Sequence, residues 1–315
     1  MNVRVVTVFG GTGFLGRRVV NHLCEHGFFA RIASRHVNRG RELFGPDGPE
    51  FQSIEVDTHD PASVANALTG AYGAVNAVSL YVERGGETFQ SVHVEAARRL
   101  AAGAQQHGLK RLVHISGIGA DASSSSLYIR KRGEGELAVR AVFPDAVVVR
   151  PAVMFGPNDA FLTSLLALLR TLPIFPMFGR GLTRLQPVYV GDVAEAIAKA
   201  IEQTEKGDRT FECGGPRVYS YEELLRALMR EAGLETRLIP MPFAAWHALA
   251  RVAEMLPNAP VTRNQIELMQ VDNVASRDVP GFAELGISPR SVEDILREML
   301  ASPRALARPA SGSSG

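Results

Sequence analysis

The glycine-rich run from Gly10 to Gly16 is the stretch whose residue types and spacing most directly predict chemistry. It reads Gly-Gly-Thr-Gly-Phe-Leu-Gly, between an apolar run at 3–9 and a helical pattern at 13–26. In a strand–turn–helix unit, such glycines permit a tight turn, close approach of a pyrophosphate and helix–strand packing. We therefore predict a dinucleotide site, and the alternative is a strand–helix turn without a ligand. The residues assigned to the site are Gly10, Thr12, Gly13, Phe14, Leu15 and Gly16.

The residues that follow the second apolar run bear on which dinucleotide would bind. A carboxylate about 20 residues beyond the glycines would hold the ribose 2′-hydroxyl of NAD, but this chain has Ser34 and Arg35 there. The guanidinium of Arg35 is a planar fork suited to a 2′-phosphate, and Arg39 and Arg41 lie nearby. We predict NADP(H) in preference to NAD(H). The alternative is a solvated basic surface.

Small or polar residues follow the later apolar runs as well. Asp57 offers an acceptor for the adenine amino group, and the alternative is a turn or helix-capping aspartate. The run Asn76-Ala77-Val78 leaves room for the ribose and the pyrophosphate. Pro151 ends another apolar run, and the backbone from there through Val153 can meet the nicotinamide carboxamide.

The elements that would position these residues alternate between short apolar strands and helical patterns. Strands are expected at 3–9, 30–33, 51–56, 74–78, 112–116 and 146–150, and helices at 13–26, 61–68, 87–107 and 127–142. This alternation predicts an α/β fold, a doubly wound parallel sheet of the Rossmann type with helices on both faces. Ligands of such sheets bind beyond the carboxyl ends of the strands, which is where the residues named above lie.

Several sequence blocks together resemble one family. They comprise the glycine run, 74–78, 88–95, 111–116, 150–157 and 187–194, with Ser116 closing a strand and Tyr128 followed by Lys131 and Arg132. The chain resembles the short-chain dehydrogenase/reductase superfamily in its extended or atypical branch. The resemblance is closer still to the nucleotide-binding accessory subunit of respiratory complex I and its free-standing bacterial relatives.

The resemblance implies a catalytic group made of Ser116, Tyr128, Lys131 and Arg132. In the superfamily the tyrosine transfers a proton, the serine holds the substrate oxygen, and a lysine lowers the tyrosine pKa and contacts the nicotinamide ribose. The superfamily spacing is Tyr-x-x-x-Lys, yet four residues after Tyr128 stands Arg132, and the lysine is one position earlier. A guanidinium keeps the positive charge but does not release a proton. The alternative is that Tyr128 only packs its ring over the cofactor site.

A second departure from the superfamily pattern lies at His93. The extended branch usually has an asparagine in this stretch, and the chain reads His93-Val94-Glu95 instead. A lone histidine on a helix is more often packed and hydrogen-bonded than functional. We expect that arrangement here.

The second half of the chain is markedly apolar. Residues 161–172 are apolar on most faces, and an apolar loop with two prolines is expected at 173–178. Arg180 and Arg184 are the only basic candidates there for a diphosphate after Arg170. This composition favours a small apolar substrate such as a quinone or lipid, or a protein or membrane partner. The alternative is an ordinary buried core.

Helix signals continue to the end of the chain. Asp192 is expected to cap a helix at 192–201, and Ser220 with Glu223 predicts a capping box for a helix at 221–232. Further patterns lie at 242–256, 282–286 and 291–300.

Composition excludes several function classes. The 315 residues carry a formal net charge of +1 with scattered basic residues, so nucleic-acid binding has no support. Two cysteines suit a reducing compartment rather than a disulfide framework. No apolar run approaches the ~18 residues of a transmembrane helix, and no metal-ligand spacing is present. A cytoplasmic location is expected, with a position at the periphery of the inner membrane as a variant.

We expect a Rossmann domain at 1–155 and 183–215, a smaller substrate or partner domain at 156–182 and 216–300, and a disordered tail at 301–315. Three functions stay open. The first is an NADP(H)-dependent oxidoreductase acting on an apolar carbonyl or quinone. The second is a non-catalytic nucleotide-binding subunit or assembly protein of a respiratory or membrane-associated complex, and the third is a nucleotide-sugar epimerase or dehydratase.

Overall fold

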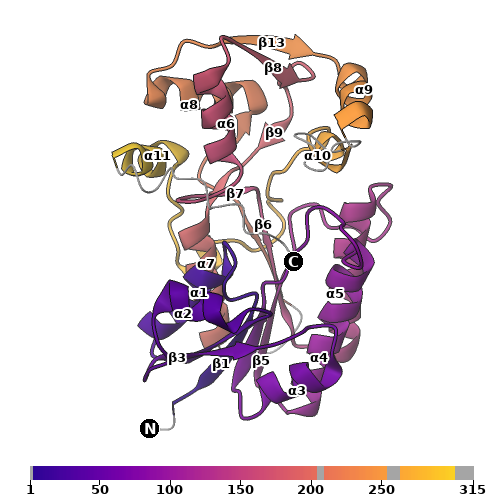
Figure 1. Ribbon diagram of the computed structural model, residues 1–315, viewed down its shortest axis with the longest axis vertical. Helices are drawn as coiled ribbons and strands as arrows, with labels where there is room; N and C mark the ends of the chain where they lie inside the picture. The colour runs from indigo at the N-terminus through magenta and orange to yellow at the C-terminus, as the bar shows by residue number, and fades with distance from the viewer. Residues whose placement is uncertain (1–2, 204–208, 254–262, 302–315) are drawn as a thin grey trace. The chain divides into compact units, whose positions relative to one another are not determined.

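A computed structural model describes residues 3–203, 209–253 and 263–301 of the chain (Figure 1). The chain divides into two compact units. Unit 1 comprises residues 1–151, 190–213 and 276–287, and unit 2 comprises residues 152–189, 214–275 and 288–315. The disordered tail predicted at 301–315 lies, apart from Ala301, outside the described residues.

Unit 1 is built on a seven-stranded parallel sheet, which confirms the predicted fold class. Its strands lie in the order β11-β6-β5-β4-β1-β2-β3. Their bounds are β1 Val5–Phe9, β2 Phe29–Ser34, β3 Phe51–Glu55, β4 Gly73–Asn76, β5 Arg111–Ile115, β6 Val147–Pro151 and β11 Arg209–Cys213. The strand order reverses at β1, which pairs with both β2 and β4. Ligands of such sheets bind at this reversal point.

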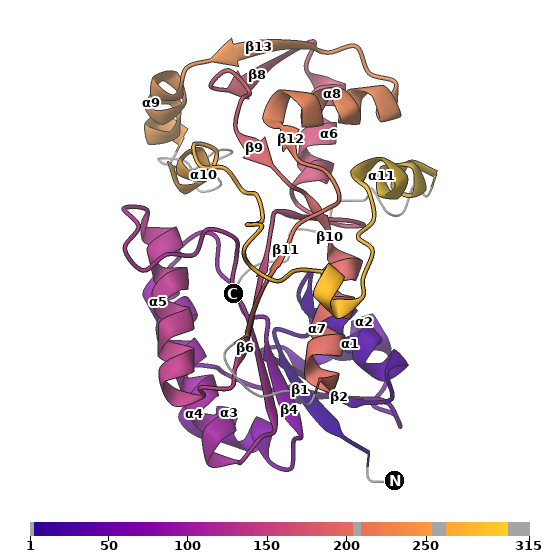
Figure 2. The same ribbon diagram turned by 180° about the vertical axis from the view of Figure 1, so that it is seen from behind.

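Helices cover both faces of this sheet (Figures 1 and 2). One face carries α1 Gly16–Glu25, α2 Val37–Phe44 and α7 Val190–Glu202, and the other carries α3 Pro61–Leu68, η1 Gln90–Ala96, α4 Ala97–Gln106 and α5 Leu127–Val142. The bounds of α3 and α5 are those expected from sequence. The short helix α2 was not predicted, because its interior glycine lowers its helix propensity.

The helix expected at 87–107 starts with a π-helical turn instead of a continuous α-helix. This turn, η1, spans Gln90–Ala96 and is followed directly by α4. At Gly135 of α5, an added Cβ would lie 2.1 Å from the His93 carbonyl oxygen. The glycine therefore lets α5 approach η1 closely. Short π-turns occur often at functional sites.

Two further expectations were wrong in detail. Residues 174–178, expected as a loop, form strand β8 Ile174–Phe178, which pairs in parallel with β13 Arg237–Met241. Pro176 in β8 and Pro240 in β13 fit because the two strands form a two-stranded sheet, in which each is an edge strand. Helix α7 begins at Val190, so Asp192 lies inside its first turn rather than at the cap. A carboxylate in the first turn still interacts favourably with the helix dipole.

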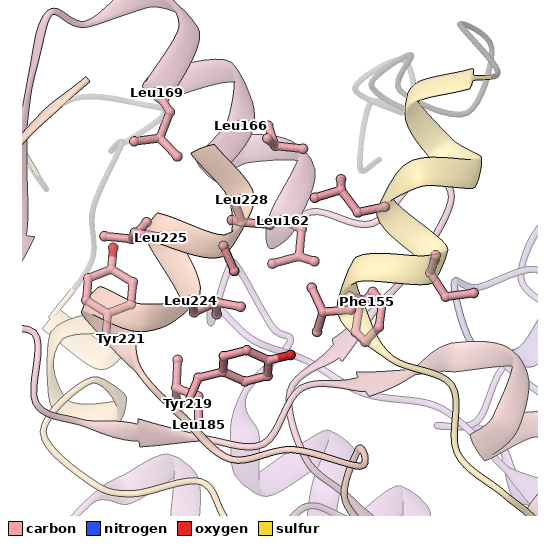
Figure 3. Close-up of a cluster of buried hydrophobic side chains, with 14 of the residues drawn as sticks. Phe155, Leu162, Leu166, Leu169, Leu185, Tyr219, Tyr221, Leu224, Leu225 and Leu228 are labelled. Atoms are coloured by element: carbon pink, nitrogen blue, oxygen red, sulfur yellow. The ribbon is translucent and has the colours of Figure 1, made fainter. Parts of the chain in front are cut away.

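Unit 2 has its own hydrophobic core (Figure 3). Helices α6 Leu162–Thr171, α8 Tyr221–Ala232 and α11 Val292–Ala301 supply most of it, with the two-residue strands β7 Met154–Phe155, β9 Arg184–Leu185, β10 Val188–Tyr189 and β12 Tyr219–Ser220. The predicted capping box of α8 is confirmed, because the Ser220 side chain accepts from Glu223 N–H and Glu223 accepts from Ser220 N–H.

The apolar segments of the second half divide between core and exposed surface. Leu162, Leu166 and Leu169 of α6 are buried. Helix α9 Phe243–Ala253 packs Trp246 against Ile266 of α10 Arg263–Leu268. Exposed apolar side chains remain at Leu168, Ile174 and Leu249, among others. The part of the predicted segment at 254–256 lies outside the described residues.

The observed units differ from the expected domains at four places. Residues 152–155, 183–189 and 214–215 fall in unit 2, where β9 pairs with β12 and β10 pairs with β7. Residues 276–287, which include the short helix η2 Ala283–Leu285, fall in unit 1. There the Glu212 N–H of β11 donates to the Pro280 carbonyl.

Candidate functional site

The glycine run forms a tight turn at the carboxyl end of β1. Gly10 has a φ of +75°, and an added Cβ there would lie 2.9 Å from the Ala77 carbonyl oxygen. At Gly16 an added Cβ would lie only 2.1 Å from the Gly10 carbonyl oxygen. The Gly13 N–H donates to Gly10 O at 2.9 Å. Each position therefore requires glycine, and the first turn of α1 is held directly against the end of the strand.

The start of α1 carries positive charge. Its first turn contains no acidic residue and instead holds Arg17 and Arg18. Burial lowers the pKa of Arg17, and the charge of Arg39 lowers it further. Cations are unfavourable at a helix N-terminus and beside each other, so a bound anion would relieve both repulsions. Arg17 was missed from sequence, although its place directly after Gly16 is a usable signal.

Arg35 directly follows the carboxyl end of β2, the strand that pairs with β1. Its guanidinium already has an acidic partner. Its Nη1 lies 2.7 Å from Glu87 Oε1, and the His59 ring contacts the other oxygen of that carboxylate at 3.3 Å. Arg35 is largely exposed. A 2′-phosphate at this position would therefore have to share the guanidinium with Glu87 or displace that carboxylate.

Three residues predicted to contact the cofactor have side chains that form hydrogen bonds within the protein. Ser34 Oγ donates to the His36 carbonyl, and Asp57 Oδ1 accepts from the His59 N–H. Asn76 is buried, donates from Nδ2 to His114 Nδ1 at 3.2 Å and accepts from the Val78 N–H. Ala77 and Val78 instead present their backbone to Gly10.

Helix α5 brings Arg132, not Lys131, beside Tyr128. The Arg132 guanidinium carbon lies 5.1 Å from the Tyr128 ring centroid, as expected for residues i and i+4 of a helix. Arg132 Nη2 also donates to Ser79 Oγ at 2.8 Å. Lys131 Nζ pairs with Glu134 at 2.7 Å instead.

Ser116 lies at the carboxyl end of β5 with an unused hydroxyl. It is 2% exposed, and its Oγ has no hydrogen-bond partner among the described residues. The same holds for Nε of Arg132, which is 8% exposed. An added Cβ at Gly117 would lie 3.0 Å from Arg132 Nη1, so the guanidinium packs against the backbone next to Ser116. Buried donors without partners are costly, and a ligand oxygen would satisfy them.

Three rings surround the Tyr128 ring. Tyr81 stacks on it at a centroid distance of 5.9 Å, and Phe89 and His93 meet it edge-on at 5.3 and 5.7 Å. His93 is buried, and its Nε2–H donates to the Leu80 carbonyl at 2.9 Å. The expectation of a packed, hydrogen-bonded histidine is confirmed.

Burial dominates the ionisation of this group. It raises the pKa of Tyr128, while the Arg132 charge acts against this rise and the neighbouring Tyr81 adds to it. Burial lowers the pKa of His93 and of His114 to about 3, and the charge of Arg132 contributes to both shifts. Both histidines are therefore neutral near pH 7, and Arg132 supplies positive charge beside the phenol.

The two remaining predicted contacts lie in different units. Pro151 ends β6 in unit 1, where its carbonyl accepts from the Ile118 N–H at 3.1 Å. Val153 belongs to unit 2, and its N–H donates to Asn273 Oδ1 at 2.7 Å.

The residues present fit a nicotinamide dinucleotide. The turn at Gly10 and Gly16 would be filled by any side chain, which is the property of a phosphate-binding loop. The arginines at the start of α1 and after β2 would face its anionic part. The unused Ser116 hydroxyl directly follows the carboxyl end of β5, which β4 separates from β1 in the same sheet.

Comparison with known proteins places the chain in a family. Over 294 residues it is 32% identical to the mitochondrial NADH dehydrogenase [ubiquinone] 1 alpha subcomplex subunit 9 of Rattus norvegicus. The match covers 92% of this chain and 78% of that protein. The chain belongs to the subunit 9 family. Residues 10–155 also match a family model described as NAD(P)H-binding, so this member of the subunit 9 family has an NAD(P)-binding domain of the short-chain dehydrogenase/reductase type.

Other relatives of this subunit 9 family member include an enzyme. Over 243 residues this chain is 28% identical to a ceramide reductase of Caulobacter vibrioides, and the match covers 76% of this chain and 74% of that protein. Among solved structures, the dTDP-glucose 4,6-dehydratase DesIV of Streptomyces venezuelae shares the fold with a TM-score of 0.71 at 18% identity, covering 94% of this chain and 96% of that one. Across the described residues, every helix is too short or too polar to span a membrane.

Proposed function

We propose that this protein is an NADP(H)-dependent oxidoreductase that reduces an apolar carbonyl or quinone-type substrate. The observation that carries the proposal is the unused, buried Ser116 hydroxyl beside the Arg132–Tyr128 pair. A carbonyl oxygen is the acceptor that a buried hydroxyl and a phenol would bind together. The named activity of one relative, a ceramide reductase, supports an apolar substrate.

The proposed roles follow from chemistry and position. Ser116 holds the substrate oxygen, and Tyr128 donates a proton to it as the carbonyl carbon is reduced. Arg132 keeps positive charge beside the phenol and opposes the effect of burial on the Tyr128 pKa. The dinucleotide, when bound, supplies the hydride. Gly10 to Gly16 and the arginines would hold it.

NADP(H) is the proposed cofactor because three arginines gather near the glycine run. Arg17 and Arg39 already affect each other electrostatically, and Arg35 follows β2. A 2′-phosphate would neutralise part of this charge, whereas the hydroxyl of NAD would not.

The proposal is tested by titrating the purified protein with NADPH and NADH and then adding apolar ketones and quinones. We expect tighter binding of NADPH and consumption of NADPH with at least one acceptor. A clear preference for NADH would contradict the arginine argument. Tight binding without consumption of NADPH would favour the second function.

That second function is a nucleotide-binding subunit or assembly protein without turnover, peripheral to a respiratory membrane. Two observations favour it. The pKa of Tyr128 is raised by burial, and Arg132 cannot pass a proton as lysine does. The subunit 9 relatives are named as parts of mitochondrial NADH dehydrogenase. It predicts co-purification with a protein partner.

A nucleotide-sugar epimerase or dehydratase is a third candidate. The shared fold with DesIV is its support. The geometry favours it less, because Arg184, a candidate ligand for a sugar-linked diphosphate, already pairs with Asp272 at 2.7 Å. A screen that includes nucleotide sugars separates this candidate from the first.

A further inference from the structure

The ring that stacks on Tyr128 belongs to an exposed residue. Tyr81 is 56% exposed, whereas Tyr128 is 7% exposed. Their ring centroids are 5.9 Å apart with an interplanar angle of 26°, and the neighbouring Tyr81 contributes to the raised pKa of Tyr128. Tyr81 therefore places an exposed phenol against the buried one.

The segment that carries Tyr81 is held at three consecutive residues. Ser79 Oγ accepts from Arg132 at 2.8 Å, and the Leu80 carbonyl accepts from His93 at 2.9 Å. Tyr81 itself then stacks on Tyr128. The position of an otherwise exposed tyrosine is thus fixed by side chains of the site.

Tyr128 needs a proton source if it is to act repeatedly. Of the groups that face it, Phe89 has no exchangeable proton, Arg132 does not release one, and the His93 Nε2–H is engaged with Leu80. Lys131 is paired with Glu134 instead. Among the described residues whose rings or charges face Tyr128, Tyr81 has both an exchangeable proton and access to solvent.

We propose that Tyr81 returns a proton from solvent to Tyr128 after each reduction. The inference rests on the proposed oxidoreductase function. In the balanced step, a hydride and the Tyr128 proton reduce one carbonyl to an alcohol. The Tyr81 proton then passes to the Tyr128 phenolate, and water or buffer reprotonates Tyr81. Tyr81 acts through Tyr128 and does not itself touch the substrate.

The kinetic test replaces Tyr81 with phenylalanine, which keeps the ring and removes the hydroxyl. NADPH-dependent reduction of an apolar ketone or quinone should fall about tenfold or more in kcat, within the range of general acid–base effects, with KM and the Kd of NADPH unchanged. Small protonated buffers such as imidazolium should restore part of the rate in Tyr81→Phe. Tyr72→Phe is the matched control, because Tyr72 packs on Phe28 instead, and its rate should stay at the wild-type value.

A second readout does not depend on turnover. Protein labelled with meta-fluorotyrosine is observed by fluorine NMR at one pH, with resonances assigned through Tyr→Phe variants. If the two phenols share a proton, the Tyr81 resonance should shift in Tyr128→Phe and keep its position in Tyr72→Phe. An unmoved Tyr81 resonance in Tyr128→Phe, or an unchanged kcat in Tyr81→Phe, overturns the relay alone. A wild-type protein that binds NADPH yet reduces no acceptor overturns the proposed function, and the relay with it.

Discussion

At the scale of single residues, an arginine takes the place that the superfamily gives to lysine. Arg132 lies beside Tyr128 and donates to Ser79, while Lys131 pairs with Glu134. Sequence could name both cations, but only the packing of α5 separates them, because positions three and four along a helix lie close together. The guanidinium retains charge but not the capacity to relay a proton.

Arg17, which sequence reasoning missed, offers the sharpest test of the predicted cofactor preference. Arg17→Ala should weaken NADPH binding by about tenfold or more, because a hydrogen bond to a charged group contributes about 1.5–3 kcal/mol. NADH binding should change much less. Calorimetric titration of both nucleotides checks this, with Arg226→Ala as control, since Arg226 pairs with Glu222 on α8. Equal losses for NADPH and NADH would contradict a 2′-phosphate contact.

At the scale of elements, the strand–turn–helix unit around the glycine run was predictable. Apolar runs and helical spacing sufficed to place β1, α3 and α5. Elements without such signals were missed or misread. Helix α2 has an interior glycine, and β8 holds a proline, so local propensity opposed the structures that packing selects.

Gly16→Ala tests the turn itself. The new Cβ would lie 2.1 Å from Gly10 O and 2.9 Å from Gly11 Cα, so the backbone must open. Overpacking of this kind costs about 1–3 kcal/mol, or roughly 2–4 °C in Tm per kcal/mol, and NADPH affinity should fall at least tenfold. Gly48→Ala is the control, because its Cβ would come no closer than 3.8 Å to the Pro46 carbonyl oxygen. Wild-type affinity in Gly16→Ala would show that the turn does not bind the cofactor.

At the scale of the whole molecule, two units with separate cores make up the chain. The bounds of these units differ from those of the two domains expected from sequence. The short strands β9 and β10 carry too few residues for a periodic pattern, and 276–287 joins unit 1 through a backbone contact of Glu212 with Pro280. Contacts between segments distant in sequence cannot be predicted from local pattern.

The buried histidines make the stability of unit 1 sensitive to acid. His93 and His114 have folded pKa values of about 3, below the value of about 6.5 in an unfolded chain. The unfolded state therefore binds more protons between these values. Their contribution is fully present above about pH 6.5 and is lost as pH falls toward 3, at about 2 kcal/mol for each histidine by about pH 5.

Urea unfolding at about pH 7 and about pH 5 measures this loss. His93→Asn retains a donor for Leu80 but removes one titrating ring. The variant should lose about 2 kcal/mol less than the wild-type protein between the two pH values. An equal loss in both proteins would show that His93 is not held neutral.

The most direct test of the central claim is single-turnover reduction by Tyr128→Phe and the wild-type protein. Each is loaded with NADPH and mixed with an apolar ketone or quinone, and the loss of reduced nicotinamide absorbance is followed. The wild-type protein should consume NADPH, and Tyr128→Phe should be slower by about 10²–10⁴-fold at unchanged NADPH affinity. Equal rates in the two proteins, or bound NADPH that the wild-type protein never consumes, would contradict the account.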